Sequence, residues 1–169
     1  HFLAFSASPA PGAPEQIGII DLHSIAKNIN WIESTGRAFF PHLSSDGSIL
    51  LFQITNNDGT KQILIQDLQT GEKTEITSPT ARSMAPQFSA DETKVVYTSL
   101  VDGNWDVYVY NRLNKTHTRI TTHSASDLAP TFAADGSIYY ASNLSGHFAI
   151  YKYNEEESLS VLIPVVNHE

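Results

Sequence analysis

The sequence contains no cysteine and a single methionine, Met84, among its 169 residues. Without cysteine the chain can form no disulfide, no thiolate nucleophile and no cysteine-ligated metal site, and it suits an oxidising or a reducing compartment equally well. No apolar run approaches the roughly 18 residues that a membrane-spanning helix needs. We therefore predict no membrane span.

Positive charge is also scarce. The chain has 10 Lys and Arg residues against 18 Asp and Glu residues, which gives a formal net charge of −8. Proteins that bind duplex nucleic acid usually carry a basic stripe that neutralises phosphates, and none is visible here, so we predict no nucleic-acid partner. The hydrophobic content of 41% is enough for a substantial core in a single domain.

Motifs of common catalytic sites are missing. There is no Gly-x-Ser-x-Gly elbow, no phosphate-binding glycine loop, no His-Glu-x-x-His helix and no Ser-x-Asp-x-Gly-x-Thr-Trp turn of the sialidase type. The stretch from Asp102 to Asp106 fills only part of a calcium loop, which needs alternating oxygen ligands and a final glutamate. A glycosidase-type carboxylate pair stays open, because its members can come from distant segments. We predict no catalytic residue, no cofactor and no metal, and the sequence favours a non-enzyme.

What the sequence does contain is a repeat. The segment Pro86–Glu92 matches Pro41–Gly47 and Pro130–Gly136, at spacings of 45 and 44 residues. Each copy continues with two Val-, Ile- or Tyr-rich runs separated by a glycine turn, and with a short final strand. The expected strands are Ile49–Phe52, Ile63–Ile65 and a strand around Ile76, then Val95–Tyr97, Val107–Val109 and a strand around Ile120, then Ile138–Tyr140, Ile150–Tyr151 and Leu162–Ile163. Four strands in a period of about 45 residues are typical of a β-propeller blade.

A degenerate copy precedes the three regular ones. Phe2–Phe5, Gln16–Leu22 and Ile29–Ile32 correspond to the second, third and fourth strands of a blade. We therefore predict an all-β fold, with residues 1–169 forming one propeller segment of four-stranded antiparallel blades, the alternative being a β-sandwich with coincidental spacing. The expected parts are a partial blade at 1–34 and blades at about 35–79, 80–123 and 124–166.

The length is short for a closed propeller. At about 45 residues per blade, a six-bladed ring needs roughly 270 residues. We therefore expect an incomplete or open ring, processed or excised from a longer chain. Apolar faces on the terminal blades would then be covered by the remainder of the protein or by self-association.

The copy that runs from Phe88 to Val109 resembles the TolB-like propeller repeat, which has an aromatic-Ser-Pro-Asp-Gly turn, an apolar strand and then Ser-x-x-Asp-Gly-x-x-x-Ile-Tyr. The turn proline is replaced at Ser45, Ala90 and Ala134, and Glu92 replaces the turn glycine. The resemblance extends over nearly the whole chain and implies a propeller. It also implies an exported bacterial setting, periplasmic or secreted, whereas function does not follow from a family defined by its fold.

The strand order places the longer loops on one face of the predicted blades. Turns between the first and second strands, and between the third and fourth, lie on a tightly turned acidic face, where Asp and Gly supply the dihedral angles. The other turns and the loops between blades lie on the opposite face, where binding residues tend to lie. The candidate binding residues on this second face are Arg82, Trp105, His123, Asp127 and His147.

Each candidate also has a purely structural interpretation. Trp105 could pack on its own blade, Arg82 could pair with Asp127, and His123 and His147 could be ordinary loop residues. At the end of the chain, Glu155–Glu157 is interpreted as a solvated turn, and Pro164 suits the end or the edge of a strand.

Three functions fit these observations. The first is a non-catalytic module of TolB-like type that presents loops to a protein or peptide partner. The second is the propeller part of a larger enzyme, such as a peptidase of the prolyl oligopeptidase type, which resembles this chain in carrying such a propeller. The third is the sensor domain of a membrane-bound regulator.

Overall fold

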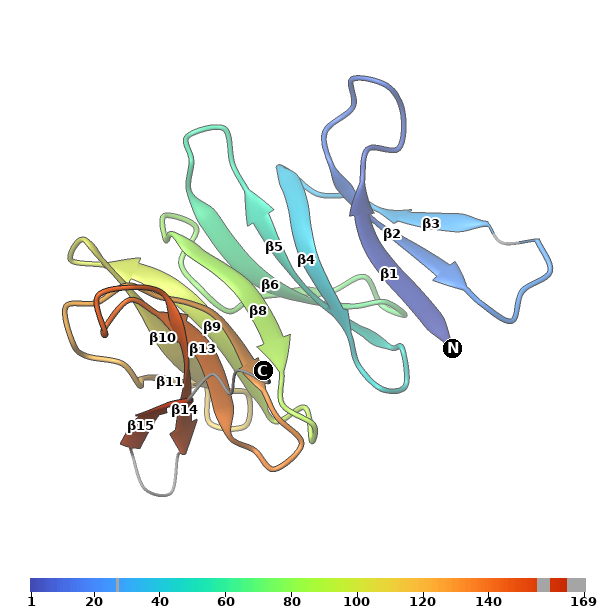
Figure 1. The fold of residues 1–169 in the computed structure, drawn as a ribbon. Helices are drawn as coiled ribbons and strands as arrows, with labels where there is room; N and C mark the ends of the chain where they lie inside the picture. The colour runs from blue at the N-terminus through green and yellow to red at the C-terminus, as the bar shows by residue number, and fades with distance from the viewer. Residues whose placement is uncertain (27, 155–158, 164–169) are drawn as a thin grey trace, which may run out of the picture. The chain divides into compact units, whose positions relative to one another are not determined.

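The computed structural model describes residues 1–26, 28–154 and 159–163, and it contains strands β1 to β15 and no helix among these residues. The predictions for Glu155–Glu157 and Pro164 lie outside the described residues. The strands form four antiparallel sheets that follow one another along the chain (Figure 1). Their bounds are β1 (Phe2–Ala7), β2 (Gln16–Asp21) and β3 (Ile29–Ile32); β4 (Arg37–Leu43), β5 (Ile49–Thr55), β6 (Lys61–Asp67) and β7 (Lys73–Glu75); β8 (Ser83–Phe88), β9 (Lys94–Val101), β10 (Asn104–Asn111) and β11 (Thr116–Arg119); and β12 (Asp127–Phe132), β13 (Ile138–Ser142), β14 (Ala149–Asn154) and β15 (Leu159–Leu162).

This architecture confirms the predicted fold class. The first sheet has three strands and each of the others has four, in sequential order, as expected for a partial copy followed by three full ones. The chain divides into two compact units, His1–Pro86 and Gln87–Glu169, which we call unit 1 and unit 2. Strand β8 begins in unit 1 and ends in unit 2.

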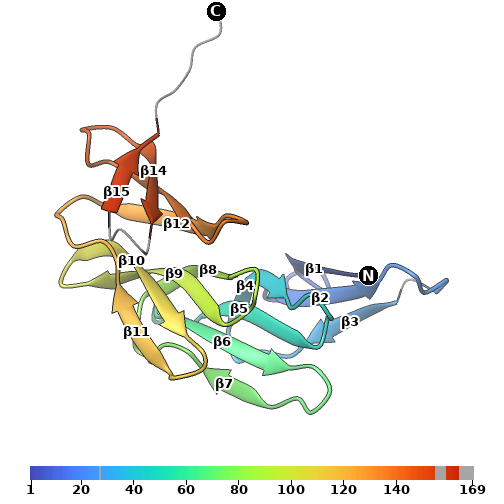
Figure 2. The same cartoon turned by 90° about the horizontal axis from the view of Figure 1, so that it is seen from below.

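Each unit has a core formed where two sheets pack face to face. In unit 1, Ile17 and Ile19 of β2 pack against Leu50 and Phe52 of β5 and Leu64 of β6, and all of these are buried. Figure 2 shows the sheet of β1–β3 beside the sheet of β4–β7. Both faces of β5 and β6 are buried along most of their length, as the apolar runs predicted.

Unit 2 repeats this packing with more aromatic residues. Val96, Val107 and Val109 of the sheet β8–β11 pack against Tyr140 and Tyr151 of the sheet β12–β15. The two tyrosine rings are stacked at a centroid distance of 5.9 Å. The core of unit 2 is thus also a sheet-on-sheet interface between consecutive copies of the repeat.

The first strand of every full copy contains the same kink. Phe40, Ala85 and Ala129, each directly before a proline, have positive φ angles of 52°, 53° and 50°. The register of β4 with β5 shifts between Phe39 and His42, and that of β12 with β13 shifts between Leu128 and Thr131, as in a β-bulge. Residues other than glycine rarely adopt this conformation, so its recurrence marks a shared structural element.

The acidic turns have the structural role expected of them. The carboxylates of Asp46, Asp91 and Asp135 each accept a hydrogen bond from the backbone N–H two residues ahead, at 2.9 to 3.1 Å. Hydrogen bonds from the Ser44 hydroxyl and from the backbone N–H and hydroxyl of Ser48 lower the pKa of Asp46 to about 2. Ser89 and Thr93 lower the pKa of Asp91 to about 2 in the same way.

Candidate functional site

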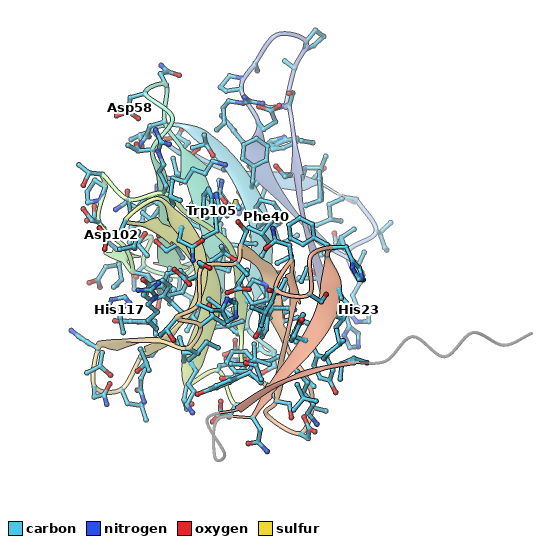
Figure 3. All side chains as sticks on the ribbon, turned by 60° about the vertical axis from the view of Figure 1, so that its left-hand side comes forward. His23, Phe40, Asp58, Asp102, Trp105 and His117 are labelled. Atoms are coloured by element: carbon cyan, nitrogen blue, oxygen red, sulfur yellow. The ribbon has the colours of Figure 1, made fainter. Side chains whose placement is uncertain are left out.

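Three connections meet at one end of unit 2. They are the β9–β10 turn at Asp102–Gly103, the β11–β12 connection at 120–126 and the β13–β14 turn at 143–148. Together with the adjoining ends of their strands we call them the loop face, residues 101–106, 119–127 and 142–148. Both residues of the β9–β10 turn have positive φ angles, 52° and 82°, as in a two-residue type I′ hairpin. Figure 3 labels Asp102 in this turn and Trp105 at the start of β10.

Side-chain amides brace the long β11–β12 connection from both sides. The Asn104 amide donates to the carbonyl oxygen of His123 at 2.9 Å, and the Asn143 side chain accepts from the N–H of Ser126 at 2.8 Å. The connection is therefore fixed to the β9–β10 hairpin and to the β13–β14 turn. A loop held in this way is already in place before a partner arrives, which lowers the entropic cost of binding.

An ion pair between a buried carboxylate and a partly exposed arginine lies at the base of the loop face. Asp106 on β10 is completely buried, and its Oδ2 accepts a hydrogen bond of 2.7 Å from Nη2 of Arg119 at the end of β11. The Arg119 Nε also donates to the carbonyl oxygen of Thr121 at 3.0 Å. One guanidinium thus links the third strand, the fourth strand and the first residues of the loop, and charge-assisted bonds of this kind are among the stronger ones in proteins.

Thr121 completes this anchor. Its hydroxyl accepts a hydrogen bond of 2.9 Å from the N–H of Val107 and lies 3.4 Å from Oδ1 of Asp106. The chain therefore leaves β11 in a fixed direction. Thr77 has the same role in unit 1, where its hydroxyl accepts a hydrogen bond of 2.9 Å from the N–H of Ile63.

A second buried carboxylate lies at the other end of the connection. Asp127, the first residue of β12, is fully buried, and its Oδ2 lies 3.6 Å from Nε2 of His123. Burial raises the pKa of Asp127, although the hydroxyls of Ser142 and Thr121 and the charge of His123 favour the ionised form. Ser142, His123 and Asp127 do not form a catalytic triad, because Ser142 is buried and its hydroxyl lies beside the carboxylate, whereas a triad needs histidine between the two.

The accessible part of the loop face mixes polar groups with large apolar side chains, and Asp102 and Arg119 are its charged residues. Leu144 is 48% exposed and Phe148 is 55% exposed, both near the β13–β14 turn, while His147 between them is also exposed. Trp105 is half-buried and lies opposite Leu100 in the β9–β10 ladder. The face therefore offers aromatic and aliphatic groups on a fixed backbone, an arrangement suited to binding.

The structure brings four of the five predicted residues to this end of unit 2. Trp105, His123, Asp127 and His147 all lie on the loop face, with Asp127 beneath its surface rather than on it. Arg82 belongs to unit 1, where it is exposed and forms a backbone bridge with Lys61. Hydrogen bonds from Thr60 are the main cause of the lowered pKa of Asp58, and the charge of Arg82 adds to this effect. The Arg82–Asp127 pair joins residues of different units and stays a prediction.

The Asp106–Arg119 pair that holds the face was not predicted from the sequence. Asp106 was considered only as part of an incomplete calcium loop, and Arg119 was not considered at all. The sequence held a signal for the Thr121 anchor alone, because Thr77 and Thr121 stand 44 residues apart, at the same position of the repeat. Within the described ranges, no group of three or more acidic or histidine side chains has a geometry that could hold a metal ion.

A hollow of about 320 Å³ lies at the opposite end of unit 2, between the β8–β9 and β12–β13 turns. Asp91, Lys94, Phe132 and Asp135 contribute to its wall. The carboxylate of Asp91 is engaged by Ser89 and Thr93, and that of Asp135 by Ser137 and Lys152. Its acidic groups therefore serve their own turns, and we regard the loop face as the better candidate.

Comparison with known proteins agrees with this architecture. The family model described as TolB beta propeller domain matches residues 15–165. The structure is similar to TolB from Acinetobacter baumannii, with a TM-score of 0.79 and 22% identity over 94% of this chain and 40% of that protein. It is similar to a puromycin-hydrolyzing peptidase of Mycobacterium tuberculosis, with a TM-score of 0.75 and 16% identity over 97% of this chain and 28% of that protein. The propeller domain of the Trilobed protease from Pyrococcus furiosus also matches, with a TM-score of 0.63 and 13% identity over 97% of this chain and 53% of that one.

These identities show likeness of fold alone, and the chain spans less than two thirds of each of the three proteins. A separate property concerns membranes: no helix long and apolar enough to cross a bilayer occurs among the residues that the structure describes.

Proposed function

The chain belongs to the TolB beta propeller domain family, and from that premise we propose that it is a non-catalytic binding module that presents the loop face of unit 2 to a protein or peptide partner. The observation that carries the proposal is the braced β11–β12 connection. Asn104 and Asn143 hold it from two sides, and the Asp106–Arg119 pair fixes its root. The ion pair to the buried Asp106 carboxylate and the two side-chain amides together keep this loop in a defined shape.

The chemistry of the face indicates the kind of segment it would bind. Leu144 and Phe148 offer apolar contact, and His147 and Trp105 add aromatic groups. Aromatic anchors of this type dominate the energetics of many interfaces. An extended peptide with one or two apolar or aromatic side chains would suit this surface better than a highly charged one.

Further parts of the proposal concern setting and assembly. We place the protein in the periplasm or outside the cell, in accordance with the family resemblance. We also propose that it self-associates through its terminal blades. The two-unit chain is proposed to act as one propeller segment with a partial blade at 1–34 and blades at about 35–79, 80–123 and 124–166.

A second candidate is an accessory part of a larger enzyme. The similarity to the puromycin-hydrolyzing peptidase favours it, because the chain accounts for 28% of that protein. The sensor domain of a membrane-bound regulator is a third candidate. Sequencing the parent gene beyond codon 169 would separate them, since a hydrolase pattern with a serine elbow supports the enzyme, and a DNA-binding helix-turn-helix with a membrane span upstream supports the regulator.

The direct test of the binding module is peptide selection. The protein would be immobilised and challenged with a displayed library of random peptides, and selected peptides would be measured by calorimetry. We expect Leu144→Glu and His147→Ala to weaken their binding by about tenfold or more, a loss of at least about 1.4 kcal/mol, because both side chains are exposed on the loop face.

The matched control is Leu113→Glu, which alters a residue that is 78% exposed in the β10–β11 turn, at the opposite end of β10 from the β9–β10 turn of the loop face. It should leave binding unchanged. Peptides that lose affinity with the control substitution and retain it with the loop-face substitutions would refute the proposal, as would a failure to select any peptide.

A further inference from the structure

One carboxylate of the loop face, that of Asp102, makes no hydrogen bond and no ion pair within the described parts of the chain. Every other aspartate accepts a hydrogen bond from a neighbouring group or lies beside a basic side chain. Asp102 is exposed in the β9–β10 turn. Its charge acts only at a distance on Tyr108, whose pKa is raised mainly by burial and to a smaller extent by Asp106 and Asp102. The Asp102 carboxylate is therefore available to a cation from another molecule.

The equivalent turn of unit 1 shows why Asp102 is unpaired. Asp58 stands 44 residues before Asp102, and its Oδ1 accepts hydrogen bonds from the N–H and the hydroxyl of Thr60 at 2.9 and 2.6 Å. The residue in the place of Thr60 is Asn104, whose amide donates instead to the carbonyl oxygen of His123 at 2.9 Å. The side chain that would hold the carboxylate of the turn thus holds the β11–β12 connection.

The remaining charges of the loop face are already engaged. Arg119 donates a hydrogen bond of 2.7 Å to the buried Asp106, and Asp127 is buried beside His123. The ranges that form the face contain no lysine, and three carboxylates stand against one arginine in them, within a chain of net charge −8. The face therefore attracts positive charge, and Asp102 is the exposed group that can pair with it.

Trp105 lies on the same hairpin as this carboxylate, three positions further along the chain (Figure 3). Alternate residues of a strand point to the same side, so Trp105 shares its side of β10 with Val107. Val107 packs against Tyr140 of the sheet β12–β15. The half-buried indole thus lies on the side that faces this sheet, whose β13–β14 turn carries the exposed apolar residues of the loop face. Indole is the aromatic group that attracts cations best.

The magnitudes of these interactions give the two kinds of group different roles. An exposed ion pair changes an affinity by no more than about fivefold. Apolar and aromatic anchors contribute more, so Leu144 and Phe148, which are 48% and 55% exposed, would supply most of the affinity. Asp102 would then determine which apolar segments are preferred, because charge complementarity acts mainly on specificity.

We propose that the loop face binds a peptide segment in which a lysine or an arginine stands next to an apolar or aromatic residue. The cation contacts Asp102 and the ring of Trp105, and the apolar side chain contacts Leu144 and Phe148. Both basic side chains suit this position, because their methylene stems cover apolar surface while the charged end stays in water beside the carboxylate. The inference rests on the proposed function and specifies the chemistry of its partner.

Parallel selections from one displayed library of random peptides test this preference. Peptides selected on the wild-type protein should be enriched in lysine or arginine next to an apolar residue. Selection on the Asp102→Asn variant should lose the enrichment. Asp91→Asn is the matched control, because it removes the same charge from an exposed residue at the opposite end of β9, and selection on it should keep the enrichment.

Calorimetry with two matched peptides separates the charge from the shape of the turn. One is a selected peptide that contains lysine, and the other carries methionine in place of that lysine. Asp102→Asn should weaken binding of the first by about threefold to fivefold, and Asp102→Lys by about tenfold or more. Neither should affect the second. Trp105→Leu should reduce the difference between the two peptides by about threefold, and circular dichroism would verify that each variant is folded.

The outcomes distinguish this inference from the proposed function. Peptides that lose affinity with Leu144→Glu but show no enrichment in basic residues would overturn the inference and leave the binding module standing. An effect of Asp102→Asn that is equal for the lysine and the methionine peptide would also overturn it, since the turn would then act through its shape. Failure to select any peptide would overturn the proposed function and this inference with it.

Discussion

The sheets β4–β7 and β8–β11 use the same backbone anchor with different side chains. In both, a threonine hydroxyl accepts the N–H of a third-strand residue at 2.9 Å, Thr77 from Ile63 and Thr121 from Val107. The neighbouring third-strand position holds the neutral Gln62 in one blade and the charged Asp106 in the other. The anchor itself therefore needs no charge. The ion pair of the later blade adds something else, the fixation of the loop that follows.

Two further pairs of equivalent residues also differ between the two blades. Glu75 is exposed on β7, whereas Arg119, 44 residues later, reaches inward to Asp106. Ser83 corresponds to Asp127 in the same way. At these positions unit 1 buries the neutral Gln62 and Ser83, whereas unit 2 buries the carboxylates of Asp106 and Asp127. The comparison predicts that substitutions in unit 2 have larger and more pH-dependent effects than their counterparts in unit 1.

Arg119→Ala should show the largest difference. It would leave the fully buried Asp106 carboxylate without a cation that is itself 36% exposed, at a cost of about 2 kcal/mol in the free energy of unfolding. Glu75→Ala, the matched change in unit 1, should alter it by less than about 0.5 kcal/mol because Glu75 is exposed. Urea unfolding would be followed by fluorescence in a Trp31→Phe background for unit 2 and a Trp105→Phe background for unit 1. Equal losses in the two units would contradict the comparison.

The shared anchor should give a smaller and equal effect in the two blades. Thr121→Val and Thr77→Val each remove the hydroxyl that satisfies a backbone N–H, with an expected cost of about 1 to 2 kcal/mol. Amide hydrogen exchange at Val107 and Ile63 reports this locally and is independent of how cooperatively the units unfold. Thr98→Val is the control, because the Thr98 hydroxyl is buried and makes no hydrogen bond among the described residues, so its loss should be neutral or slightly stabilising.

The pH dependence is the most subtle difference. Burial raises the pKa of Asp127, so the folded protein holds this proton more tightly than the unfolded chain does. The stability associated with Asp127 is therefore greatest below the ordinary aspartate pKa of about 3.9 and is lost as the pH rises through the raised pKa. Asp127→Asn removes this dependence, so the variant should gain stability relative to wild type as the pH rises through that window.

Asp46 and Asp91 contribute to the pH dependence of stability with the opposite sign. Their pKa values in the folded protein are lowered to about 2, so they stabilise the folded state at pH values above the ordinary aspartate pKa and lose this effect as the pH falls. For that reason the measured quantity is the difference between wild type and variant at each pH. A constant difference would show that Asp127 titrates normally. A variant that loses stability relative to wild type as the pH rises would reverse the assigned direction.

Most of the fold followed from the sequence because its signals are local and repeated. The segments that begin at Pro41, Pro86 and Pro130, each with Leu or Phe two residues later, set the period, and the apolar Val-, Ile- and Tyr-rich runs set the strands. The loop face also followed, because strands that alternate in direction must place their connections at two ends. These inferences require only the order of residues along the chain.

The support of the loop face could not be predicted in the same way. Asp106 and Arg119 are 13 residues apart on different strands, and their pairing depends on the register of β10 with β11 and on complete burial of the carboxylate. Asp127 was predicted to be a surface group, and the structure places it under the loop beside His123. Neither burial nor cross-strand register can be derived from a residue's type alone.

The kink at Phe40, Ala85 and Ala129 bears on how the protein reaches this structure. A residue with positive φ followed by proline does not fit a regular pleat, so a strand that contains it cannot slide along its neighbour without misplacing the kink. The kink therefore fixes the alignment of any pair of strands that forms. It does not distinguish one blade from another, since the full copies share it, and exchange of equivalent strands between copies of the chain is the misfolding route that this repeat leaves open.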